Sequence, residues 1–515
     1  MSTISRHRWR IGIPSVLILL ALLASLAFTI SSRGASSFAA IAGSHVISTD
    51  PFHNKTSQHQ TEVEPDSFAF GHTVVTAMQQ GRFWDGGASD IGFATSTDGG
   101  HTFIHGSLPG LTVYSTPAGP YARASDASVA YDAKHKVWLI SSLGIVTPSG
   151  PVDVVVNRST DGGLHWSGAV PVNKTGHFND KNWTACDDTP SSPFYGNCYT
   201  EFDNASAGDQ IQMSTSHDGG KTWGPAKTTA NHDFGIGGQP IVQPSGRVIV
   251  PIIGFVFNAT QPFIMNSFIS DDGGKTWSAT IKITPIRSHV PEGGIRADIP
   301  LPSAEIDAAG KVYLVWSDCR FEPGCRYNDI VLSTSTDGIH WTGPKRIPID
   351  RIGSTVDHFI PGIAVDRTTT GGSAHIGLTF YYYPVFNCQP LTCHLTVGFV
   401  SSTNGGASWS TRERISPSMY VEFLPLTTQG FMFGDYISTS IVPGSADANP
   451  FYDVAGVPTG TPKKSLTCTD AGVTCHVDTY TASLPITGGT NAAGNNEATY
   501  VPTSGKKLTA PPTAY

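Results

Sequence analysis

The chain has 515 residues and a formal net charge of −8, and only 14% of its residues are charged. No basic block stands beyond the N-terminus, so the sequence lacks the positive patch that nucleic-acid binding requires. Its 55 glycines and 36 prolines are typical of a β protein with many turns, although the length alone would allow two or three domains.

The N-terminal residues 1–34 predict a membrane-targeting segment. Residues 1–10 carry Arg6, Arg8 and Arg10, and residues 13–30 form a nearly uninterrupted apolar run. That run is just long enough to span a bilayer, and its basic flank would stay in the cytoplasm. An N-terminal membrane anchor is therefore preferred over a signal peptide, while the small residues around Ala40 leave cleavage open. Residues 35–60 are polar and irregular, which indicates a linker.

One octet pattern recurs six times and organises the rest of the chain. Each copy follows a run of apolar or β-branched residues that is typical of a strand. An aspartate can accept bonds from backbone N–H groups just downstream, and glycine supplies positive φ, so each copy predicts a hairpin turn. Turn stability accounts for every residue of the pattern, so six separate functional sites are not expected. The copies are STDGGHTF (96–103), STDGGLHW (159–166), SHDGGKTW (216–223), SDDGGKTW (270–277), the shortened STDGIHW (335–341) and STNGGASW (402–409).

These octets resemble the Asp-box, or BNR, repeat of the sialidase-like β-propellers. The resemblance implies an all-β propeller over residues 61–486, built of four-stranded antiparallel blades with the octet between the third and fourth strands. Repeats of this length fit stacked copies of one structural unit. After the sixth octet three more strand-like segments begin at residues 434, 449 and 475, and a strand before residue 64 would complete them. Seven blades are therefore preferred over six, with residues 487–515 as a disordered C-terminal tail.

Eight cysteines fall in four close pairs, and short loops closed by neighbouring cysteines predict disulfides in an oxidising compartment. Metal ligation by cysteine is not expected, because CxxC-like spacing with nearby histidines is absent. The chain is thus expected to be extracellular, either secreted or tethered by its N-terminal helix. The pairs are Cys186 with Cys198, Cys319 with Cys325, Cys388 with Cys393, and Cys468 with Cys475.

The propeller interpretation also predicts where functional side chains lie. First strands line the axis and start at the face opposite the octets, so polar residues at their starts, or after second strands, meet at one mouth. Charge is scarce in this chain, so its recurrence at those places indicates a ligand site. The expected residues are Arg82, Arg123, Asp126, Asp180, Lys181, Glu201, Gln239, Arg296, Asp298, Asp318, Arg320, Asp357, His358, Asp435 and Tyr436.

The resemblance to sialidases implies catalytic roles for a few of these residues. Asp126 would protonate the leaving oxygen, and Tyr436 would be the nucleophile. Glu201 or Glu292 would lie beside the tyrosine and activate it. The other residues of the set would contact the substrate.

A sialidase also needs three arginines that hold the carboxylate of its substrate. Arg82, Arg296 and Arg320 would take that role here. The first-blade stretch EPDSFAFGHTVV, however, holds no arginine and no Arg-Ile-Pro signature. The chain departs from the family pattern at this point, which puts sialidase activity in doubt.

Two other functions fit the same mouth. A pair among its six aspartates could hydrolyse another glycan, with the carboxyl separation deciding the stereochemical outcome. A non-catalytic module that binds glycan or protein at the cell surface is favoured by the missing arginine. No cofactor is expected, although several aspartates would suit Ca²⁺. The expected partner is an extracellular glycan or glycoprotein, and the chain is expected to be a monomer that touches membrane only through its N-terminus.

Overall fold

The structure is a computed structural model that describes residues 43–256, 262–389, 392–460, 468, 472–489 and 491–492. The expected N-terminal anchor or signal segment lies outside the described residues, as do residues 493–515 of the expected tail. No helix in the described ranges has the length and apolar character of a membrane span.

The described chain is nearly all-β, as the octets and their flanking strands predicted. It contains no α-helix among the described residues. Its four short 3₁₀ helices are η1 (Ala205–Ala207), η2 (Pro323–Cys325), η3 (Gly371–Ser373) and η4 (Val421–Phe423).

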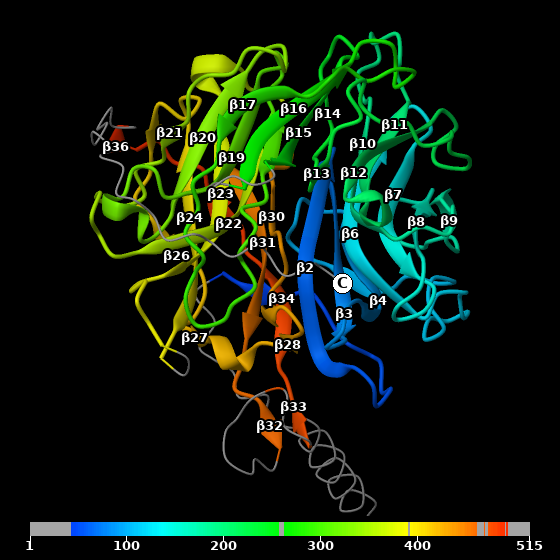
Figure 1. The fold of residues 1–515 in the computed structure, drawn as a ribbon, viewed down its shortest axis with the longest axis horizontal. Helices are drawn as coiled ribbons and strands as arrows, with labels where there is room; N and C mark the ends of the chain where they lie inside the picture. The colour runs from blue at the N-terminus through cyan, green and yellow to red at the C-terminus, as the bar shows by residue number, and fades with distance from the viewer. Residues whose placement is uncertain are drawn as a thin grey trace, which may run out of the picture. The chain divides into compact units, whose positions relative to one another are not determined.

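The strands pair antiparallel in successive groups, which we number as units in chain order (Figure 1). Unit 1 contains β2 (Gln58–Phe70), β3 (Thr73–Arg82), β4 (Ala88–Ser96) and β5 (Ile104–Ser107). Unit 2 contains β6 (Arg123–Asp132), β7 (Val137–Ile145), β8 (Val152–Ser159) and β9 (Val170–Asn173). Unit 3 contains β10 (Asn179–Cys186), β11 (Cys198–Asn204) and β12 (Gln210–Ser216).

The next three units repeat this arrangement. Unit 4 contains β13 (Gly235–Ile236), β14 (Ile241–Val242), β15 (Val248–Phe255), β16 (Phe263–Ser270) and β17 (Ile281–Pro285). Unit 5 contains β18 (Ser303–Ile306), β19 (Val312–Asp318), β20 (Asp329–Ser335) and β21 (Lys345–Arg346). Unit 6 contains β22 (Asp357–Val365), β23 (Ile376–Tyr383), β24 (His394–Ser402) and β26 (Glu413–Arg414).

Unit 7 joins the two ends of the described chain. Its strands are β30 (Ser438–Ser440), β31 (Asp447–Ala455), β34 (Val477–Thr481) and, from the N-terminal side, β1 (His45–Val46). β1 lies within the stretch expected to be a linker. β34 also pairs with β2 through Thr61 and Val477, so β2 and β34 lie side by side in Figure 1.

Short strands outside these units decorate their edges. β36, at residues 491–492, lies in the stretch that was expected to be a disordered tail, and it pairs with β25. The others pair as β27 with β24, β35 with β31, β28 with β29, and β32 with β33. Their bounds are β25 (Ser408–Trp409), β27 (Met419–Tyr420), β28 (Leu426–Thr427), β29 (Gly430–Phe431), β32 (Thr459–Gly460), β33 (Val473–Thr474), β35 (Leu484–Pro485) and β36 (Asn491–Ala492).

Apolar side chains pack between neighbouring units rather than within one common core. The second strands, such as β7, β15 and β23, are rich in Val, Ile and aromatic residues because both of their faces are buried. Seven buried clusters occur in the described chain. Six combine residues of two neighbouring units, and the seventh combines units 6 and 7 with Val63 of unit 1. Val75 and Trp138 share the cluster between units 1 and 2, whereas Val74 and Phe451 share the one between units 1 and 7. Unit 7 therefore packs against unit 1.

The first strands of neighbouring units are linked by hydrogen bonds from backbone to side chain. In most of these links a polar side chain of one first strand accepts a bond from a backbone N–H group of the next strand. Such bonds satisfy polar groups on strand edges that have no further strand to pair with. Six links are Val129 N–H to Asp66, Thr184 N–H to Ser128, Ala304 N–H to Gln239, Ile363 N–H to Ser303, Ser67 N–H to Ser438, and the Thr439 hydroxyl to the Gly362 carbonyl.

Each octet forms a turn closed by its acidic or amide side chain. In the fourth copy Asp272 Oδ1 accepts bonds from Ser270 Oγ at 2.9 Å and from the backbone N–H of Thr276 at 3.0 Å. Asn404 keeps the pattern in the sixth copy, because its Oδ1 accepts a bond from the backbone N–H of Ser408 at 2.8 Å. The same bonds surround Asp98, Asp161, Asp218 and Asp337. The structural explanation of the octet therefore holds for all six copies.

The four predicted cysteine pairs are all bonded, which confirms the disulfide prediction. Disulfides of this kind are typical of extracellular or secreted proteins.

The octet turns provide a first prediction. We expect Asp272→Ala to lower the free energy of unfolding by ~1–2 kcal/mol, because it leaves the N–H of Thr276 without its acceptor. The matched control is Asp271→Ala, which removes an exposed ion pair with Arg247 and should cost less than ~1 kcal/mol. Urea unfolding measures both. Equal losses would mean that the octet aspartate does not close the turn.

Several carboxyl groups are buried without a cation beside them. Asp66 is 3% exposed and accepts the 2.7 Å bond from Val129 that links units 1 and 2. Burial raises its pKa to about 7. In unit 6, burial raises the pKa of Asp357 to about 8. At neutral pH such groups retain protons that an unfolded chain would release.

The second prediction concerns pH. Between pH ~4 and ~7 the folded state binds a proton on Asp66 that the unfolded state has lost, so the free energy of unfolding falls as pH rises. Asp66→Asn keeps an acceptor for Val129 but removes the titration. We expect it to abolish ~2–3 kcal/mol of the stability difference between pH 5 and pH 8. Urea unfolding at both values tests this, with the exposed Asp298→Asn as control. An unchanged difference in Asp66→Asn would contradict the assignment.

Candidate functional site

Three consecutive first strands carry a charged residue in a strained backbone conformation. Glu64 in β2, Asp126 in β6 and Lys181 in β10 have φ values of 59°, 51° and 48°. Each lies at an interruption of the strand register. A non-glycine residue at positive φ costs ~1–3 kcal/mol, and such residues concentrate at functional sites. Ile360 in β22 shares the conformation, with φ of 49°, but carries no charge.

These bulges direct charged side chains toward one another. Lys181 Nζ lies 2.8 Å from Asp126 Oδ1 and 3.9 Å from Glu64 Oε1, and it also binds Asp435. Arg296 Nη2 binds the same Asp435 carboxylate at 2.7 Å. One lysine therefore ties together carboxyl groups from units 1, 2 and 7. We call the set the axial cluster, and its members are Glu64, Arg82, Asp126, Asp180, Lys181, Arg296, Asp435 and Tyr436.

The carboxyl groups of the axial cluster differ in their affinity for protons. Burial raises the pKa of Glu64 to about 7. Burial also raises the pKa of Asp180 to about 6, against the opposing effect of Lys181. Burial acts in the same direction on Asp435, but Arg296 and Lys181 outweigh it and lower its pKa to about 2. The cluster thus places carboxyl groups that keep a proton near neutral pH beside one that does not, which is the arrangement acid–base catalysis needs.

Arg82 is a buried cation that no described carboxylate pairs with directly. Its side chain is 3% exposed, and Nη1 donates a 2.8 Å bond to Gln79 Oε1. Its Nε has no hydrogen-bond partner in the described chain. Burial, together with the charge of Arg296, lowers the Arg82 pKa to about 10. An anionic group of a ligand would satisfy this guanidinium.

Tyr436 is held in place by its own hydroxyl. The hydroxyl donates a 2.9 Å bond to the Ala127 carbonyl, and the ring packs edge-on against Trp183. Burial raises its pKa well above the usual range. Glu201, expected beside this tyrosine, lies opposite Trp183 in the pairing of β10 and β11. The Glu201 carboxyl is fully buried, and no described cation forms an ion pair with it.

Two expected arginines are engaged elsewhere. Arg123 binds Asp85 at 2.6 Å and stacks over the Phe83 ring at 3.9 Å. Arg320 folds back on Asp318, with Nε 2.9 Å from Oδ1 and Nη2 2.6 Å from Oδ2. Both guanidinium groups are therefore satisfied by neighbours close to them in the chain or in the adjoining loop.

Three more expected residues also lie apart from the axial cluster. Asp357 accepts a 2.7 Å bond from the backbone N–H of Asn328, and Asp298 is exposed. Burial lowers the pKa of His358 to about 4, and its ring lies near Asp350. In total the structure brings together Arg82, Asp126, Asp180, Lys181, Arg296, Asp435 and Tyr436, and it places Arg123, Glu201, Asp298, Asp318, Arg320, Asp357 and His358 elsewhere.

The sequence interpretation missed one member of the axial cluster, Glu64. Glu64 accepts bonds from the backbone N–H of Asp435 and from Gln79, which in turn binds Arg82. Glu64 lies within β2, at the interruption of the strand register between Val63 and Asp66. The residue pattern of β2 does not reveal this interruption.

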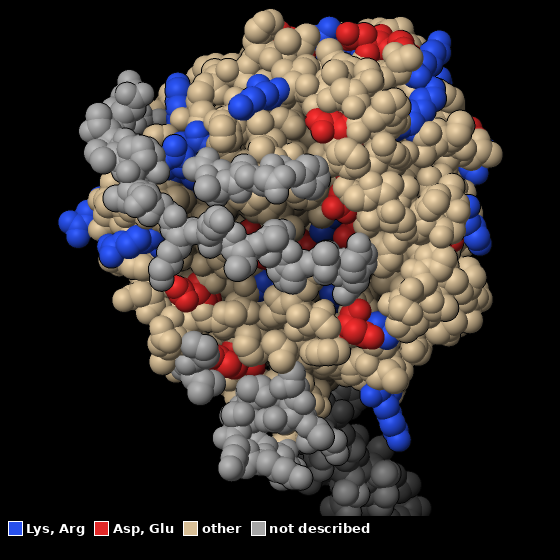
Figure 2. All heavy atoms as spheres, viewed as in Figure 1, with Lys and Arg blue, Asp and Glu red and all other residues tan. Residues whose placement is uncertain are grey.

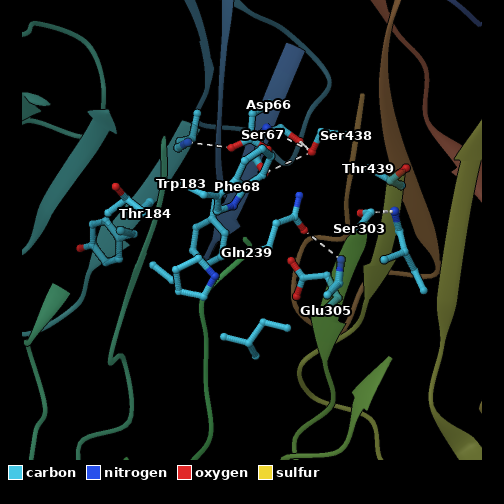
Figure 3. A pocket seen from close by; sticks show the side chains of 18 of the residues that line it. Asp66, Ser67, Phe68, Trp183, Thr184, Gln239, Ser303, Glu305, Ser438 and Thr439 are labelled. Atoms are coloured by element: carbon cyan, nitrogen blue, oxygen red, sulfur yellow. Dashed lines mark hydrogen bonds between the residues drawn. The ribbon is translucent and has the colours of Figure 1, made fainter. Parts of the chain in front are cut away.

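Two cavities with two lining residues in common lie along the first strands. The smaller is lined by Asp126, Lys181 and Tyr436, and it shares Trp183 and Gln239 with the larger. The larger measures about 700 Å³ including space open to solvent. Figure 3 shows its polar lining, including Asp66, Gln239 and Ser438. Figure 2 shows acidic and basic side chains deep in a hollow near the middle of one face, whereas most of that face is uncharged.

No family model matches the chain. A curated sialidase of Bacteroides fragilis (strain YCH46) is 24% identical over 294 residues, covering 51% of this chain and 49% of the sialidase. The chain thus spans about half the length of this relative. Among solved structures, an ulvan lyase is 10% identical, with 86% of this chain and 97% of the lyase covered and a TM-score of 0.47. An intramolecular trans-sialidase from Ruminococcus gnavus is 14% identical, with coverage of 85% and 97% and a TM-score of 0.40. At TM-scores below 0.5, neither structure informs the function of this chain.

Proposed function

We propose that the seven units are the blades of a closed, sialidase-like β-propeller with Asp-box turns. Three observations support this architecture. Apolar clusters pack between consecutive units, including units 7 and 1. Backbone-to-side-chain bonds link the first strands, and β1 from the N-terminal side completes unit 7.

We further propose that the protein is an exo-acting glycoside hydrolase that acts on extracellular glycans carrying an anionic group. The observation that carries the proposal is the axial cluster, where three cations, four carboxyl groups and a tyrosine meet beside a cavity. Sequence similarity to a sialidase over about half of the chain supports the choice of substrate class. The four disulfides support an extracellular location.

The residues divide into binding and chemical roles. Arg82, with its unsatisfied Nε, and Arg296 would hold the anionic group. Asp180 would donate a proton to the leaving oxygen, because burial raises its pKa to about 6. Asp126, which Lys181 orients at 2.8 Å, is the second carboxyl group of the pair.

Tyr436 offers a competing route of the sialidase type. It lines the same cavity as Asp126, but it would have to release its bond to the Ala127 carbonyl before it could attack. Asp126 accepts bonds from Lys181 at Oδ1 and from Ser125 at Oδ2, but each carboxylate oxygen keeps a further lone pair. We therefore propose the pair of carboxyl groups as the catalytic pair, with Tyr436 as a contact to the sugar.

The third prediction tests these roles. With a panel of fluorogenic α-sialosides, β-glucuronides and neutral glycosides, we expect Asp180→Asn and Asp126→Asn to lower kcat by ~10²–10⁴-fold. Tyr436→Phe should keep more than about a tenth of the activity, because removal of a hydroxyl contact costs ~1 kcal/mol. The control is Asp298→Asn, an exposed carboxyl outside the axial cluster. A loss in Tyr436→Phe as large as that in Asp126→Asn would instead assign the nucleophile to the tyrosine.

Asp180 should also determine how kcat depends on pH in the same assay. A proton donor must be protonated to act, so kcat should fall as pH rises through about 6. The control is the same pH profile measured with an activated substrate, whose leaving group needs no protonation. With that substrate we expect kcat no longer to fall as pH rises through about 6.

A glycan- or protein-binding module remains the alternative function. It is favoured by one observation: Lys181 and Arg296 are already neutralised by Asp126 and Asp435. This alternative predicts capture on a glycan array without release of product from any bound glycan. Product release that depends on Asp180 would eliminate it.

A further inference from the structure

We propose that units 5 and 6 share a buried site for a divalent transition-metal ion, with Asp329, Asp350 and His358 as ligands. The site is separate from the axial cluster and does not depend on the proposed hydrolase function. One potential ligand atom of each residue lies within 4.8 Å of those of the other two. Asp329 begins β20, Asp350 follows β21, and His358 lies in β22.

The histidine presents the correct nitrogen. His358 Nδ1 lies 3.1 Å from the Asn328 carbonyl oxygen, which can only accept a hydrogen bond. Nδ1 must therefore carry the proton, and Nε2 of the neutral ring carries the lone pair. His358 is fully buried, and Nε2 has no hydrogen-bond partner in the described chain. Metal-binding histidines usually donate their second ring nitrogen to a backbone carbonyl or carboxylate in this way.

Arg346 holds the carboxylates of Asp329 and Asp350 through one oxygen of each. Arg346 Nε lies 2.8 Å from Asp329 Oδ1, and Arg346 Nη2 lies 2.7 Å from Asp350 Oδ1. The second oxygen of each carboxylate keeps capacity for a further ligand, although Asp350 Oδ2 also lies 4.0 Å from Arg412 Nη1. Asp329 Oδ2 is buried and has no hydrogen-bond partner in the described chain. Asp350 Oδ2 accepts one bond, from Ser354 Oγ at 2.9 Å, and keeps a further lone pair.

The geometry is close to that of a metal site. Asp350 Oδ2 lies 3.6 Å from His358 Nε2. Two ligands at ~2.0–2.1 Å from a tetrahedral ion are ~3.4 Å apart, so only a small contraction is needed at this pair. One imidazole nitrogen with two carboxylate oxygens suits Zn²⁺ and similar first-row ions, whereas Ca²⁺ prefers oxygen ligands alone.

The local charge also allows a cation. Glu322, Asp329 and Asp350 face the guanidinium groups of Arg346 and Arg412. With all three carboxyl groups ionised, they exceed the two guanidinium groups by one negative charge in a largely buried place. A bound divalent ion would compensate this charge. The ion would also hold the segment between β21 and β22 against unit 5. We therefore assign the ion a structural role.

The test uses the full chain and Zn²⁺ as the probe. The protein is stripped with a chelator, dialysed and titrated with Zn²⁺, with the bound metal measured by elemental analysis and calorimetry. We expect about one ion per chain and a Tm that rises with Zn²⁺ concentration. His358→Asn should weaken Zn²⁺ binding at least ~10-fold, as loss of a metal's supporting contacts already does. His340→Asn is the control, because His340 is an exposed octet histidine whose side chain is 86% accessible.

Two results would overturn the proposal: no Zn²⁺ retained at stoichiometric level by the wild type, or equal affinity in His358→Asn and wild type. A second measurement covers the case in which His358→Asn does not fold. The wild type loaded with Co²⁺ should show the intense visible absorption of a low-symmetry nitrogen and oxygen site. A spectrum identical to that of aqueous Co²⁺ would also contradict the proposed metal site.

Discussion

The first strands of the seven units depend on one another because each has an edge that is left largely uncovered by other strands, with single residue pairs to β34 for β2 and to β4 for β6. A strand edge carries unpaired N–H and C=O groups that must be satisfied or shielded. Here polar side chains link the first strands of most neighbouring units to backbone groups, as Asp66 does between units 1 and 2 and Ser438 does between units 7 and 1. In the proposed ring, the charges of the axial cluster meet where Glu64, Asp126 and Lys181 stand on three first strands.

The axial cluster is costly to build. It combines positive φ at Glu64, Asp126 and Lys181 with the burial of cations and carboxylates. Burial of paired charges rarely stabilises a fold, because the loss of hydration exceeds the Coulomb attraction unless the geometry is good. The apolar clusters between units supply the compensating stability. A strained and buried charge cluster placed beside a cavity is best explained by function.

Part of this organisation was predictable from the sequence, because it is local. The octets identify their own turns, and the close cysteine pairs identify their bonds. The positions of Asp126 and Lys181 followed from the starts of first strands. Arg320 could not be assigned in that way, because a two-residue step lets its guanidinium close on Asp318. For Glu64, the sequence does not reveal the register interruption that turns the side chain inward.

The proposed closure of the ring is tested most directly by a disulfide between its two ends. Ser67 Oγ in unit 1 lies 2.8 Å from Ser438 Oγ in unit 7, although the residues are 371 positions apart in sequence. The double variant Ser67→Cys, Ser438→Cys should form a cross-link in the folded protein, detectable by mass spectrometry of a non-reduced digest. Each single variant should form none. Two free thiols in the folded double variant under oxidising conditions would contradict the ring, and with it the convergence of charge at the axis.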